Sequence, residues 1–439
     1  MNKEIKERIE TIKKGKVPDG FIKGEVGLIP VDWKTAVLND ISEIITKTAG
    51  KGIYETVSIS AGIGFVNQAK KFGKELSGKQ YEKYIVLYKG DFSYNKGNSK
   101  TYPQGCIYRL NDRETAAVPN VFESFRIKSG CAYYYDQLFT SGFLNKQLSR
   151  KINHGVRDDG LLNLTGKDFY SCVLPFPPVK EQEKIAEILS RCDKVIEECE
   201  KQVEEYKNLK KTCLSKMFPK KGSNVPEIRF PGFTDAWEQR KVTELGEIYI
   251  GLVTTMTSHY TDHGALLIRN SDIKDGRFAF GDNLIYLDDE FAKQNASRKH
   301  RVGDVITVHT GDIGTSAVIT EKEAGSIGFA TIVTRPDKEK ITSEYLCTYL
   351  NTDTHKNFAM NISTGDGRNN YNLKDYYECV VPVPSIAEQN KISSLISGLN
   401  NLITLHQRKV EAYTQMKKAL TQLLLTGIVR VNKQQEISY

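Results

Sequence analysis

The longest regular pattern of apolar positions runs from residue 181 to residue 217, where apolar or aromatic residues are spaced alternately four and three apart. This alternation is typical of a coiled-coil seam, in which one narrow stripe of each helix faces a partner helix. The stretch contains neither proline nor glycine, so the pattern predicts one uninterrupted helix. At about 1.5 Å per residue this helix would be roughly 55 Å long.

The same pattern returns 207 residues later, from residue 388 to residue 424. Lys210 interrupts the first stripe, and Lys417 interrupts the second at the matching position. Two unrelated surface helices, the alternative interpretation, would not be expected to share such an interruption, so we expect the two helices to pack on each other. The predicted seam positions are Ile185, Leu189, Ile196, Val203 and Tyr206 in the first helix, and Ile392, Ile396, Ile403, Val410 and Tyr413 in the second.

The repeat extends into the segments that precede both helices. Three pairs of segments match between the two halves of the chain: residues 33–44 and 237–248, residues 90–92 and 303–305, and residues 167–175 and 374–382. Between these anchors, short β-like runs alternate with loops rich in Gly, Asn, Ser and Lys. The chain is therefore predicted to be a tandem duplication of one unit, made of a mixed α/β domain of about 150 residues, a proline-rich exit and a long helix.

A short, turn-rich linker at residues 219–228 predicts the direction of the helices. The second globular domain must begin near the end of the first helix, and it leads directly into the start of the second helix. If that domain is compact, the two helices are antiparallel. The predicted fold class is therefore α+β, with two similar domains of mixed α/β structure separated by two long antiparallel helices in a pseudo-two-fold tandem repeat.

The predicted boundaries follow from the breaks in these patterns. They are an N-terminal helix and linker at 1–24, a first globular domain at 25–178, a first long helix at 179–218, a linker at 219–228, a second globular domain at 229–384, a second long helix at 385–428 and a C-terminal tail at 429–439. We expect the N-terminal helix to pack near the end of the second long helix, which would close the pseudo-circle of the repeat.

Composition adds modest constraints. The formal charge of +8 and pI near 8.8 are compatible with nucleic-acid binding but are not specific to it. Eight cysteines form no CxxC pair, which favours a reducing compartment. The N-terminus is charged throughout, unlike a signal peptide, and no run of 18 apolar residues exists, so the chain is predicted to be cytoplasmic and not bound to a membrane.

Two similar domains joined by rigid helices would suit a protein that reads two DNA half-sites. Duplex DNA turns once in about 34–36 Å, so domains at such a separation could contact sites about one turn apart. The segments between the matching anchors differ between the two halves, which predicts two different half-sites and an asymmetric target.

The loops of both domains carry residues that contact DNA in other proteins. Arg, Asn and Gln bind base edges, while Lys mainly positions the phosphate backbone. For any single residue a solvated turn is an alternative of roughly equal weight, because Gly, Asn and Lys are common turn residues. The candidates are Asn67, Gln68, Lys70, Lys71, Asn95, Lys96, Asn98, Lys100, Tyr102 and Arg157 in the first domain, and Arg269, Asn270, Thr310, Arg368, Asn369 and Asn370 in the second.

The arrangement of these motifs over nearly the full length resembles the specificity (S) subunit of type I restriction–modification systems. The resemblance rests on four segments taken together: Gly27-Leu-Ile-Pro-Val-Asp-Trp33, Leu174-Pro-Phe-Pro-Pro-Val-Lys-Glu-Gln182, Arg229-Phe-Pro-Gly-Phe-Thr-Asp-Ala-Trp237 and Val383-Pro-Ser-Ile-Ala-Glu-Gln389. It implies two target-recognition domains, each binding one part of a bipartite double-stranded DNA sequence. It also implies that the long helices set the gap and dock two methyltransferase (M) subunits, which methylate adenine N6, and that restriction (R) subunits join for ATP-driven cleavage.

Catalytic motifs are missing from the sequence. The nearest phosphate-loop match, residues 73–80, lacks the final Ser or Thr, and no Asn-Pro-Pro-Phe/Tyr methyltransferase motif occurs. His259 and His263 are four residues apart, but they lie in a loop-like context without a cysteine partner, so a metal is not expected. We predict no catalytic residue, metal or cofactor in this chain. The resemblance implies S-adenosylmethionine, Mg²⁺ and ATP only for the partner subunits.

Three alternative interpretations remain open at this point. The chain could itself be a nuclease or methyltransferase, for which it would need the motifs that are missing. It could be a structural coiled-coil adaptor, an interpretation that assigns no function to the two globular domains with basic loops. It could also bind DNA outside restriction–modification. The sequence does not reveal either half-site or the gap length.

Overall fold

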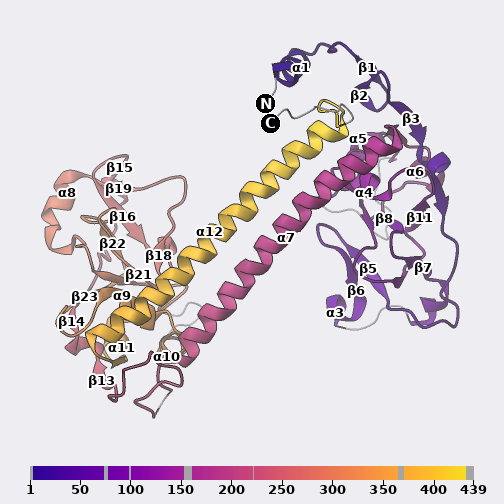
Figure 1. The fold of residues 1–439 in the computed structure, drawn as a ribbon. Coiled ribbons are helices and arrows are strands. Elements are labelled where there is room, and N and C mark those ends of the chain that lie inside the picture. Colours follow the sequence, from indigo (N-terminus) through magenta and orange to yellow (C-terminus); the bar gives the residue numbers. More distant parts are fainter. Residues whose placement is uncertain are drawn as a thin grey trace. The chain divides into compact units, whose positions relative to one another are not determined.

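The computed structural model describes residues 3–73, 78–97, 100–152, 161–220, 222–363 and 370–431. The chain divides into two compact units, of which unit 1 comprises residues 1–198 and 410–439 and unit 2 comprises residues 199–409. Two long helices are present, α7 at Val179–Lys216 and α12 at Ile386–Leu425. Each of them begins in one unit and ends in the other (Figure 1).

Unit 1 contains a four-stranded antiparallel sheet in the order β4-β11-β8-β9, together with the strand pairs β1-β2, β3-β12, β5-β6 and β7-β10. Its helices besides the long ones are α1 (Lys3–Lys13), α2 (Leu38–Ile41), α3 (Gln68–Phe72), α4 (Ala132–Thr140), α5 (Asn145–Lys151) and α6 (Gly166–Tyr170). Its strands are β1 (Phe21–Gly24), β2 (Gly27–Pro30), β3 (Lys34–Val37), β4 (Ser42–Ile44), β5 (Val57–Ser60), β6 (Gly64–Asn67), β7 (Ile85–Tyr88), β8 (Phe92–Asn95), β9 (Cys106–Arg109), β10 (Thr115–Val118), β11 (Glu123–Ile127) and β12 (Val173–Phe176).

Unit 2 contains an antiparallel sheet in the order β14-β23-β20-β21 and a second sheet in the order β15-β19-β16-β22, in which β16 and β22 are parallel. Its shorter helices are α8 (Asp289–Gln294), α9 (Ser343–Leu350), α10 (Asp353–Ile362) and α11 (Leu373–Tyr376). Its strands are β13 (Glu238–Lys241), β14 (Gly246–Ile250), β15 (Tyr260–Thr261), β16 (Ala265–Arg269), β17 (Ile273–Lys274), β18 (Arg277–Phe278), β19 (Tyr286–Leu287), β20 (Val305–Thr307), β21 (Ser316–Val318), β22 (Ile327–Phe329), β23 (Ile332–Pro336) and β24 (Val380–Val383).

The two units share one frame, which confirms the predicted repeat. The sheet β4-β11-β8-β9 of unit 1 corresponds strand by strand to β14-β23-β20-β21 of unit 2, and the pair β3-β12 corresponds to β13-β24. In both units the last strand of this pair leads directly into a long helix. The parallel pair β16-β22 has a shorter counterpart in the described part of unit 1, where Thr56, just before β5, forms a parallel bridge with Ala117 of β10.

A recurring Gly-Asp pair fixes the central strand of each sheet. Gly90 and Gly303 have φ values of 96° and 91°, a left-handed conformation that favours glycine. The carboxylate of Asp91 accepts two hydrogen bonds from Arg126 at 2.6 and 2.9 Å. Asp304 accepts two from Arg335 at 2.9 and 3.0 Å. The motif therefore recurs because in both units a buried aspartate pairs with an arginine of the matching neighbouring strand.

Each unit shows directly that the long helices run antiparallel. In unit 1 the core contains Ile185 and Leu189 from the start of α7 and Leu424 from the end of α12. In unit 2 the core contains Ile392 from the start of α12 and Met217, which follows the end of α7. The start of one helix therefore shares a core with the end of the other in both units (Figure 1).

The seam positions are buried to different degrees along the two long helices. Ile185 and Leu189 are fully buried, whereas Ile196 and Ile403 near the helix middles are half-buried. Val203, Ile392 and Ile396 are also buried, and Tyr206, Val410 and Tyr413 are half-buried. Two helices alone cover only one side of each stripe, so several of these positions keep partial access to solvent.

A glutamine at the start of each long helix ties that helix to its globular domain. Gln182 accepts the backbone N–H of Cys131 at 2.8 Å and donates to the carbonyl of Pro177 at 2.9 Å. Gln389 accepts the N–H of Thr342 at 2.9 Å. Both glutamines are fully buried. The recurring Glu-Gln motif therefore serves to fix where each helix begins.

The N-terminal helix α1 lies beside the end of α12, where the sequence predicts it. Nη1 of Arg8 donates to the carbonyl of Ile428 at 3.0 Å, and the guanidinium lies 5.6 Å from the ring centroid of Phe21. None of the residues of α1 is buried. Within the part of the chain that the structure describes, no helix has both the length and the apolar character needed to span a bilayer.

Candidate nucleic-acid interface

Three loops of unit 2 that are far apart in the sequence meet at Asn270, the first residue after strand β16. Its side-chain oxygen accepts a hydrogen bond from the backbone N–H of His309 at 2.8 Å. Its side-chain nitrogen donates to the carbonyls of Phe329 at 3.3 Å and Ala330 at 3.1 Å. Asn270 therefore joins the loop after β16, the loop after β20 and the turn between β22 and β23.

The segment before α11 joins the same group. Oγ1 of Thr310 donates to Oδ1 of Asn370 at 2.9 Å, and the N–H of Tyr371 donates to the carbonyl of His309 at 2.9 Å. The structure thus brings three predicted site residues together, although their contact with DNA stays a prediction. We call this group the Asn270 cluster; it consists of Asn270, His309, Thr310, Phe329, Ala330 and Asn370.

The polar members of the Asn270 cluster are electrically neutral near pH 7. Burial lowers the pKa of His309 below its ordinary value, so its imidazole is uncharged there. Nδ1 of His309 lies 2.7 Å from Oγ1 of Thr310, which ties the two side chains together. Neutral amide and hydroxyl groups suit hydrogen bonding with base edges better than they suit phosphates, which attract cations.

Arg269, also predicted to contact DNA, is held by its own loop. Its Nε and Nη2 donate to the carboxylate of Asp272 at 3.0 and 2.9 Å, and the Asp272 side chain is 4% exposed. These are two of the donors that a bidentate contact to guanine would need. The placement therefore favours a role in positioning Asn270. The third guanidinium nitrogen, Nη1, takes no part in the pair with Asp272.

The sequence reasoning missed Phe329 and Ala330. Phe329 ends strand β22 and is 39% exposed. Ala330 has a φ of 48°, a strained value for a residue with a Cβ atom. An aromatic residue between Gly328 and Ala330, just before the β-branched run 331–334, was the available signal, but an exposed Phe cannot be told from a core Phe by sequence pattern alone.

Unit 1 repeats the backbone of this arrangement with different side chains. Gly97 is bridged to Leu161, as Thr310 is bridged to Asn370 in unit 2. The N–H of Leu162 donates to the carbonyl of Lys96 at 2.9 Å, as Tyr371 does to His309 in unit 2. The predicted residues Asn95 and Lys96 therefore occupy the corresponding loop, where Asn95 accepts the N–H of Gly97 at 2.8 Å and Lys96 pairs with Glu123 at 3.0 Å.

Helix α3 places the predicted residues of the 67–71 segment in different surroundings. Asn67 caps the helix by accepting the N–H of Lys70 at 3.0 Å, and Lys70 and Lys71 are exposed. Gln68 is only 2% exposed, and it donates to the hydroxyl of Tyr84 at 3.3 Å. That position favours a structural role for Gln68 over the predicted DNA contact.

Of the remaining predicted DNA-contacting residues, the structure describes two and does not describe the other four. Lys100 is exposed, and Tyr102 is half-buried. The Tyr102 hydroxyl lies so close to Gly62 that a Cβ atom on this glycine would be 3.2 Å from it. This places Tyr102 against the turn between β5 and β6. Asn98, Arg157, Arg368 and Asn369 lie outside the described residues.

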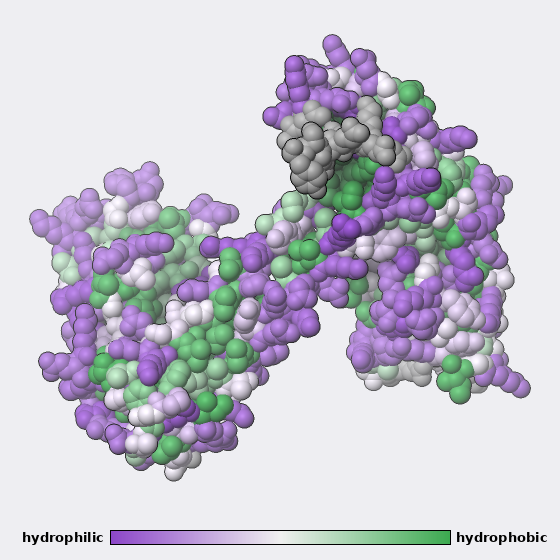
Figure 2. Space-filling model, in the orientation of Figure 1, coloured by the Kyte–Doolittle hydropathy of each residue, from purple (hydrophilic) through white to green (hydrophobic). Residues whose placement is uncertain are grey.

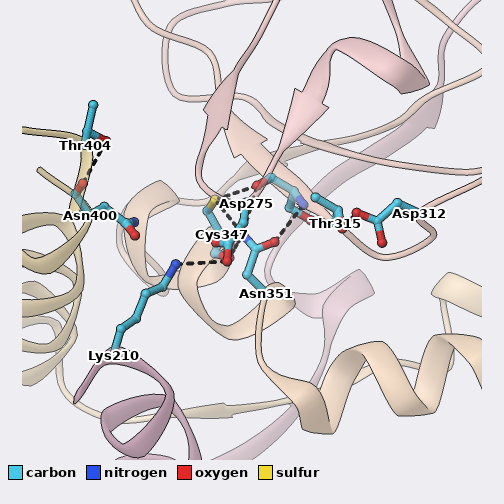
Figure 3. Close-up of polar contacts among 9 residues, drawn as sticks. Lys210, Asp275, Asp312, Thr315, Cys347, Asn351, Asn400 and Thr404 are labelled. Atoms are coloured by element: carbon cyan, nitrogen blue, oxygen red, sulfur yellow. Dashed lines mark hydrogen bonds and ion pairs between the residues drawn. The ribbon is translucent and has the colours of Figure 1, made fainter. Parts of the chain in front are cut away.

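The lysine that interrupts the seam of α7 points toward the globular part of unit 2. Nζ of Lys210 lies 2.9 Å from Oδ2 of Asp275, in the turn between β17 and β18 (Figure 3). Close by, Asn351 accepts the N–H of Ser316 at 3.0 Å and donates to its carbonyl at 2.8 Å, which fixes β21 against α9 (Figure 3). The interruption is therefore a charged anchor between helix and domain.

The matching lysine of α12 has a related role in unit 1. Lys417 forms an ion pair with Asp193 of α7. The same carboxylate accepts hydrogen bonds from the Tyr133 hydroxyl and from Nε2 of Gln137, both at 3.1 Å and both on α4. Lys417 thus reaches the globular part of unit 1 through an aspartate on the facing helix.

Two repeats of one α/β unit, each followed by a long helix and each carrying a loop group of hydrogen-bonding side chains, define a two-domain recognition protein. The chain belongs to the type I restriction modification DNA specificity domain family, whose model matches residues 30–205 and 234–414. It is a DNA-recognition subunit of the type I restriction–modification kind, and this family of specificity subunits is non-catalytic.

Several known proteins are similar to this chain. The proposed MjaX type I restriction enzyme specificity subunit of Methanocaldococcus jannaschii is 25% identical over 94% of this chain and 97% of its own length. The MjaVIII specificity subunit of the same organism is 23% identical over 68% of this chain and 70% of its own length.

A solved structure supports the fold. The S subunit of a type I restriction–modification system from M. genitalium matches with a TM-score of 0.56 and 14% identity, over 89% of this chain and 96% of that chain. At this identity the match bears on the fold alone, and it agrees with the two repeated units and long helices described above.

Proposed function

We propose that each unit reads one half of a bipartite, asymmetric DNA target, unit 2 through the Asn270 cluster and unit 1 through the loops around Lys96. The observation that carries this proposal is that one backbone arrangement presents different side chains in the two units. Thr310 and Asn370 occupy the bridge in unit 2, whereas Gly97 and Leu161 occupy it in unit 1. A shared frame with different hydrogen-bonding groups would give two related domains different base preferences.

Exposed lysines would supply the sequence-independent part of binding. Lys70 and Lys71 lie in the last turn of α3, and Lys100 lies in the loop after β8; all three are exposed. Contacts of this kind orient a protein on the phosphate backbone and release counterions, so binding would weaken as salt rises. Asn98, Arg157, Arg368 and Asn369 remain candidates of the same proposal.

The long helices would set the gap between the half-sites. Helix α7 has 38 residues and α12 has 40 residues, and neither is interrupted. At about 1.5 Å per residue each is close to 60 Å long. Because a packed pair of continuous helices resists bending, its length would determine how many base pairs lie unread between the two half-sites.

The helices would also dock two methyltransferase subunits, and matching exposed apolar residues support this. Val195 of α7 is 43% exposed, and Leu402, at the equivalent position of α12, is 37% exposed. Leu209 and its equivalent Met416 are 48% and 54% exposed. Apolar residues are visible on the surface of the long helices among hydrophilic ones (Figure 2). Exposed apolar positions that occur in pairs suit two copies of one partner.

The docking proposal has a direct test. Val195→Lys and Leu402→Lys should each remove one methyltransferase copy, and the double variant should remove both, as measured by native mass spectrometry of the co-purified complex. Val302, which is 46% exposed in the loop before β20, provides the matched control variant Val302→Lys. Full assembly of the double variant would place the docking surface elsewhere.

The chemistry of the complex would reside in the partners. We propose that S-adenosylmethionine is bound by the methyltransferase subunits, that Mg²⁺ and ATP act with the restriction subunits, and that this chain supplies no catalytic group. Membership of the specificity-domain family argues against an adaptor without a nucleic-acid role.

The experiment that tests the recognition proposal is a map of N6-methyladenine in cells that carry this chain with its methyltransferase subunit, compared with cells that lack the chain. A new bipartite motif methylated on both strands is the expected result. Thr310→Ala should then change base preference in one half-site, and Asn95→Ala should change it in the other. A change in both half-sites from either variant would contradict the assignment of one unit to each.

A further inference from the structure

The turn between β22 and β23 in unit 2 has an unusual backbone. Among the described residues, Ala330 is the only one besides glycines with a positive φ, at 48°. A left-handed conformation is unfavourable for alanine, because its Cβ atom crowds the backbone. Such residues persist only where neighbouring contacts impose them, and they are concentrated at functional sites.

Several contacts impose the conformation of this turn. The N–H of Ala330 donates to the carbonyl of Leu252 at 2.8 Å, and the N–H of Leu252 donates to the carbonyl of Gly328 at 2.8 Å. From the other side, the side chain of Asn270 donates to the carbonyls of Phe329 and Ala330. The backbone of the turn is thus held on two sides, while the Phe329 side chain remains 39% exposed.

Two buried polar atoms next to Gly328 in this turn have no hydrogen-bond partner among the described residues. Nε2 of His300 and Oγ1 of Thr331 are both buried and have no partner in this part of the chain. A Cβ atom on Gly328 would lie 2.1 Å from Oγ1 of Thr331, so a larger residue there would force the Thr331 side chain to move. Burial lowers the pKa of His300 to about 4, so the group under the turn is neutral near pH 7.

The position of Phe329 in the sheet places it at the Asn270 cluster. Strand register pairs it with Arg269, and paired residues have their side chains on the same face of a sheet. The exposed ring therefore lies on the same face as the Arg269 side chain, while Asn270 holds the Phe329 carbonyl. An apolar side chain in such a position can contact the thymine methyl group. An apolar side chain of this kind would contribute little to phosphate binding.

The corresponding turn of unit 1 carries a different residue. Arg126 of β11 matches Arg335 of β23, so Asn120 lies at the position of Phe329. Asn120 is exposed. The two units thus present an amide and an aromatic ring, respectively, at one equivalent point, which suits recognition of two different bases.

We propose that Phe329 is a specificity-determining residue that makes an apolar contact with bases of the half-site read by unit 2. This inference rests on the proposed recognition of one half-site by each unit. The strained turn and the Asn270 side chain hold the ring in position, and the ring discriminates by shape and hydrophobic contact.

The test uses the full chain co-expressed with its methyltransferase subunit, and its probe is a plasmid library of random sequence read out by N6-methyladenine mapping. Phe329→Ala should relax selectivity by at least about tenfold at one or two adjacent positions of one half-site, which is the discrimination expected of one good base contact. The other half-site should not change. Phe329→Leu should keep part of the selectivity, and the slope of binding against salt should be the same as for the unaltered protein, because no phosphate contact is lost.

Two control variants make the outcome decisive. Val302→Ala removes a similarly exposed apolar side chain near the opposite end of β20 and should leave the motif unchanged. Asn270→Ala tests the proposed location itself. If Asn270→Ala alters a half-site and Phe329→Ala does not, the inference about Phe329 is wrong while the proposed interface stands. If neither alters a half-site, the interface lies elsewhere. A uniform loss at every position of both half-sites would also overturn the inference, since it would reveal a structural defect.

Discussion

Glu181, at the start of α7, accepts two hydrogen bonds from Arg430, which follows the end of α12 and is 249 residues away in the sequence. The distances are 2.8 and 2.9 Å, and Glu181 also accepts Nε1 of Trp33 at 3.1 Å. The Glu181 side chain is fully buried, while the second partner of Arg430, Asp32, is 55% exposed. This pair closes unit 1 at the point where its two separate chain segments meet.

Unit 2 contains the same pair in a continuous segment. Arg229, in the linker after α7, donates to Glu388 at the start of α12 at 2.7 and 2.8 Å, and its guanidinium lies 6.0 Å from the ring centroid of Trp237. In unit 1 the arginine comes instead from the C-terminal tail. The arginine that pairs with the buried glutamate therefore comes from the tail segment after α12 in the first repeat, and from the inter-repeat linker in the second.

Glu181→Gln should destabilise unit 1 by about 3 kcal/mol, because it leaves the Arg430 charge without its buried partner. Hydrogen exchange of unit 1 peptides across a urea series would measure the change. The matched control is Asp32→Asn, which removes the exposed partner of the same arginine and should cost under about 1 kcal/mol. Equal effects of the two variants would show that the buried position of Glu181 is unimportant.

The sequence predicted the repeat and the fold class because both depend on patterns that recur in the two halves of the chain, and it predicted the antiparallel helices because the linker at 219–228 is short. The Arg430 pair escaped prediction for a physical reason. Arg229 and Arg430 are 201 residues apart, whereas Glu181 and Glu388 are 207 apart, so the arginines do not match when the repeats are aligned without gaps. A contact that depends on where the chain returns after a helix leaves no periodic signal.

The candidate site was predictable only in part. Asn270, Thr310 and Asn370 were identified by residue type, and the structure places them together. The contribution of Phe329 depends on the parallel pairing of β16 with β22, two strands separated by about 60 residues, and local sequence does not specify such long-range pairing. For the same reason the burial of Gln68 could not be seen from its polar neighbours.

Asp304→Asn should destabilise unit 2 by about 3 kcal/mol, since Asp304 is 1% exposed and accepts two hydrogen bonds from Arg335. The effect should appear as a lower urea midpoint. Glu247 provides a control on the same arginine, because it pairs with Arg335 at 3.2 Å but is 66% exposed. Glu247→Gln is therefore expected to change stability by less than about 1 kcal/mol. Asp91→Asn should cause a smaller loss in unit 1, because its partner Arg126 is 49% exposed and can be solvated, and a null result there would argue against the equivalence of the two pairs.

Unit 2 should lose stability in mild acid because of His355. Its imidazole is fully buried between the carbonyl of Leu350 and the hydroxyl of Tyr371, at 2.7 and 3.2 Å, and burial lowers its pKa to about 4. Below the unfolded pKa of about 6.5, only the unfolded state binds the proton, so stability falls as pH drops toward 4 by up to about 1.4 kcal/mol per pH unit. His300, with a pKa of about 4, acts in the same direction.

The acid effect can be measured through Trp237, the tryptophan of unit 2, in a Trp33→Phe background. Urea midpoints between pH 7 and pH 5 should fall, and His355→Gln should reduce the slope with pH, because one of the three histidines whose pKa burial lowers, His300, His309 and His355, no longer contributes. His263→Gln is the control. His263 is exposed and its pKa is raised by Asp262, so its contribution has the opposite sign, and replacing it should leave the loss in acid intact. An unchanged slope in His355→Gln would show that this histidine is protonated in the folded protein.

Shortening both long helices by one heptad should change the gap in the DNA target but neither half-site. Removing residues 199–205 and 407–413 deletes opposing segments, since Tyr206 lies against His406 with ring centroids 5.4 Å apart. Seven residues amount to about 10.5 Å of helix, or about three base pairs at 3.4 Å each, and the change in helical phase is only about 20°. N6-methyladenine mapping should therefore return both original half-sites with a gap shorter by up to about three base pairs.

A matched insertion of seven glycine and serine residues into the 219–228 linker should leave the gap unaltered, because the linker follows α7 within unit 2. Changed base preferences in the shortened variant would show that the helices do more than set the spacing.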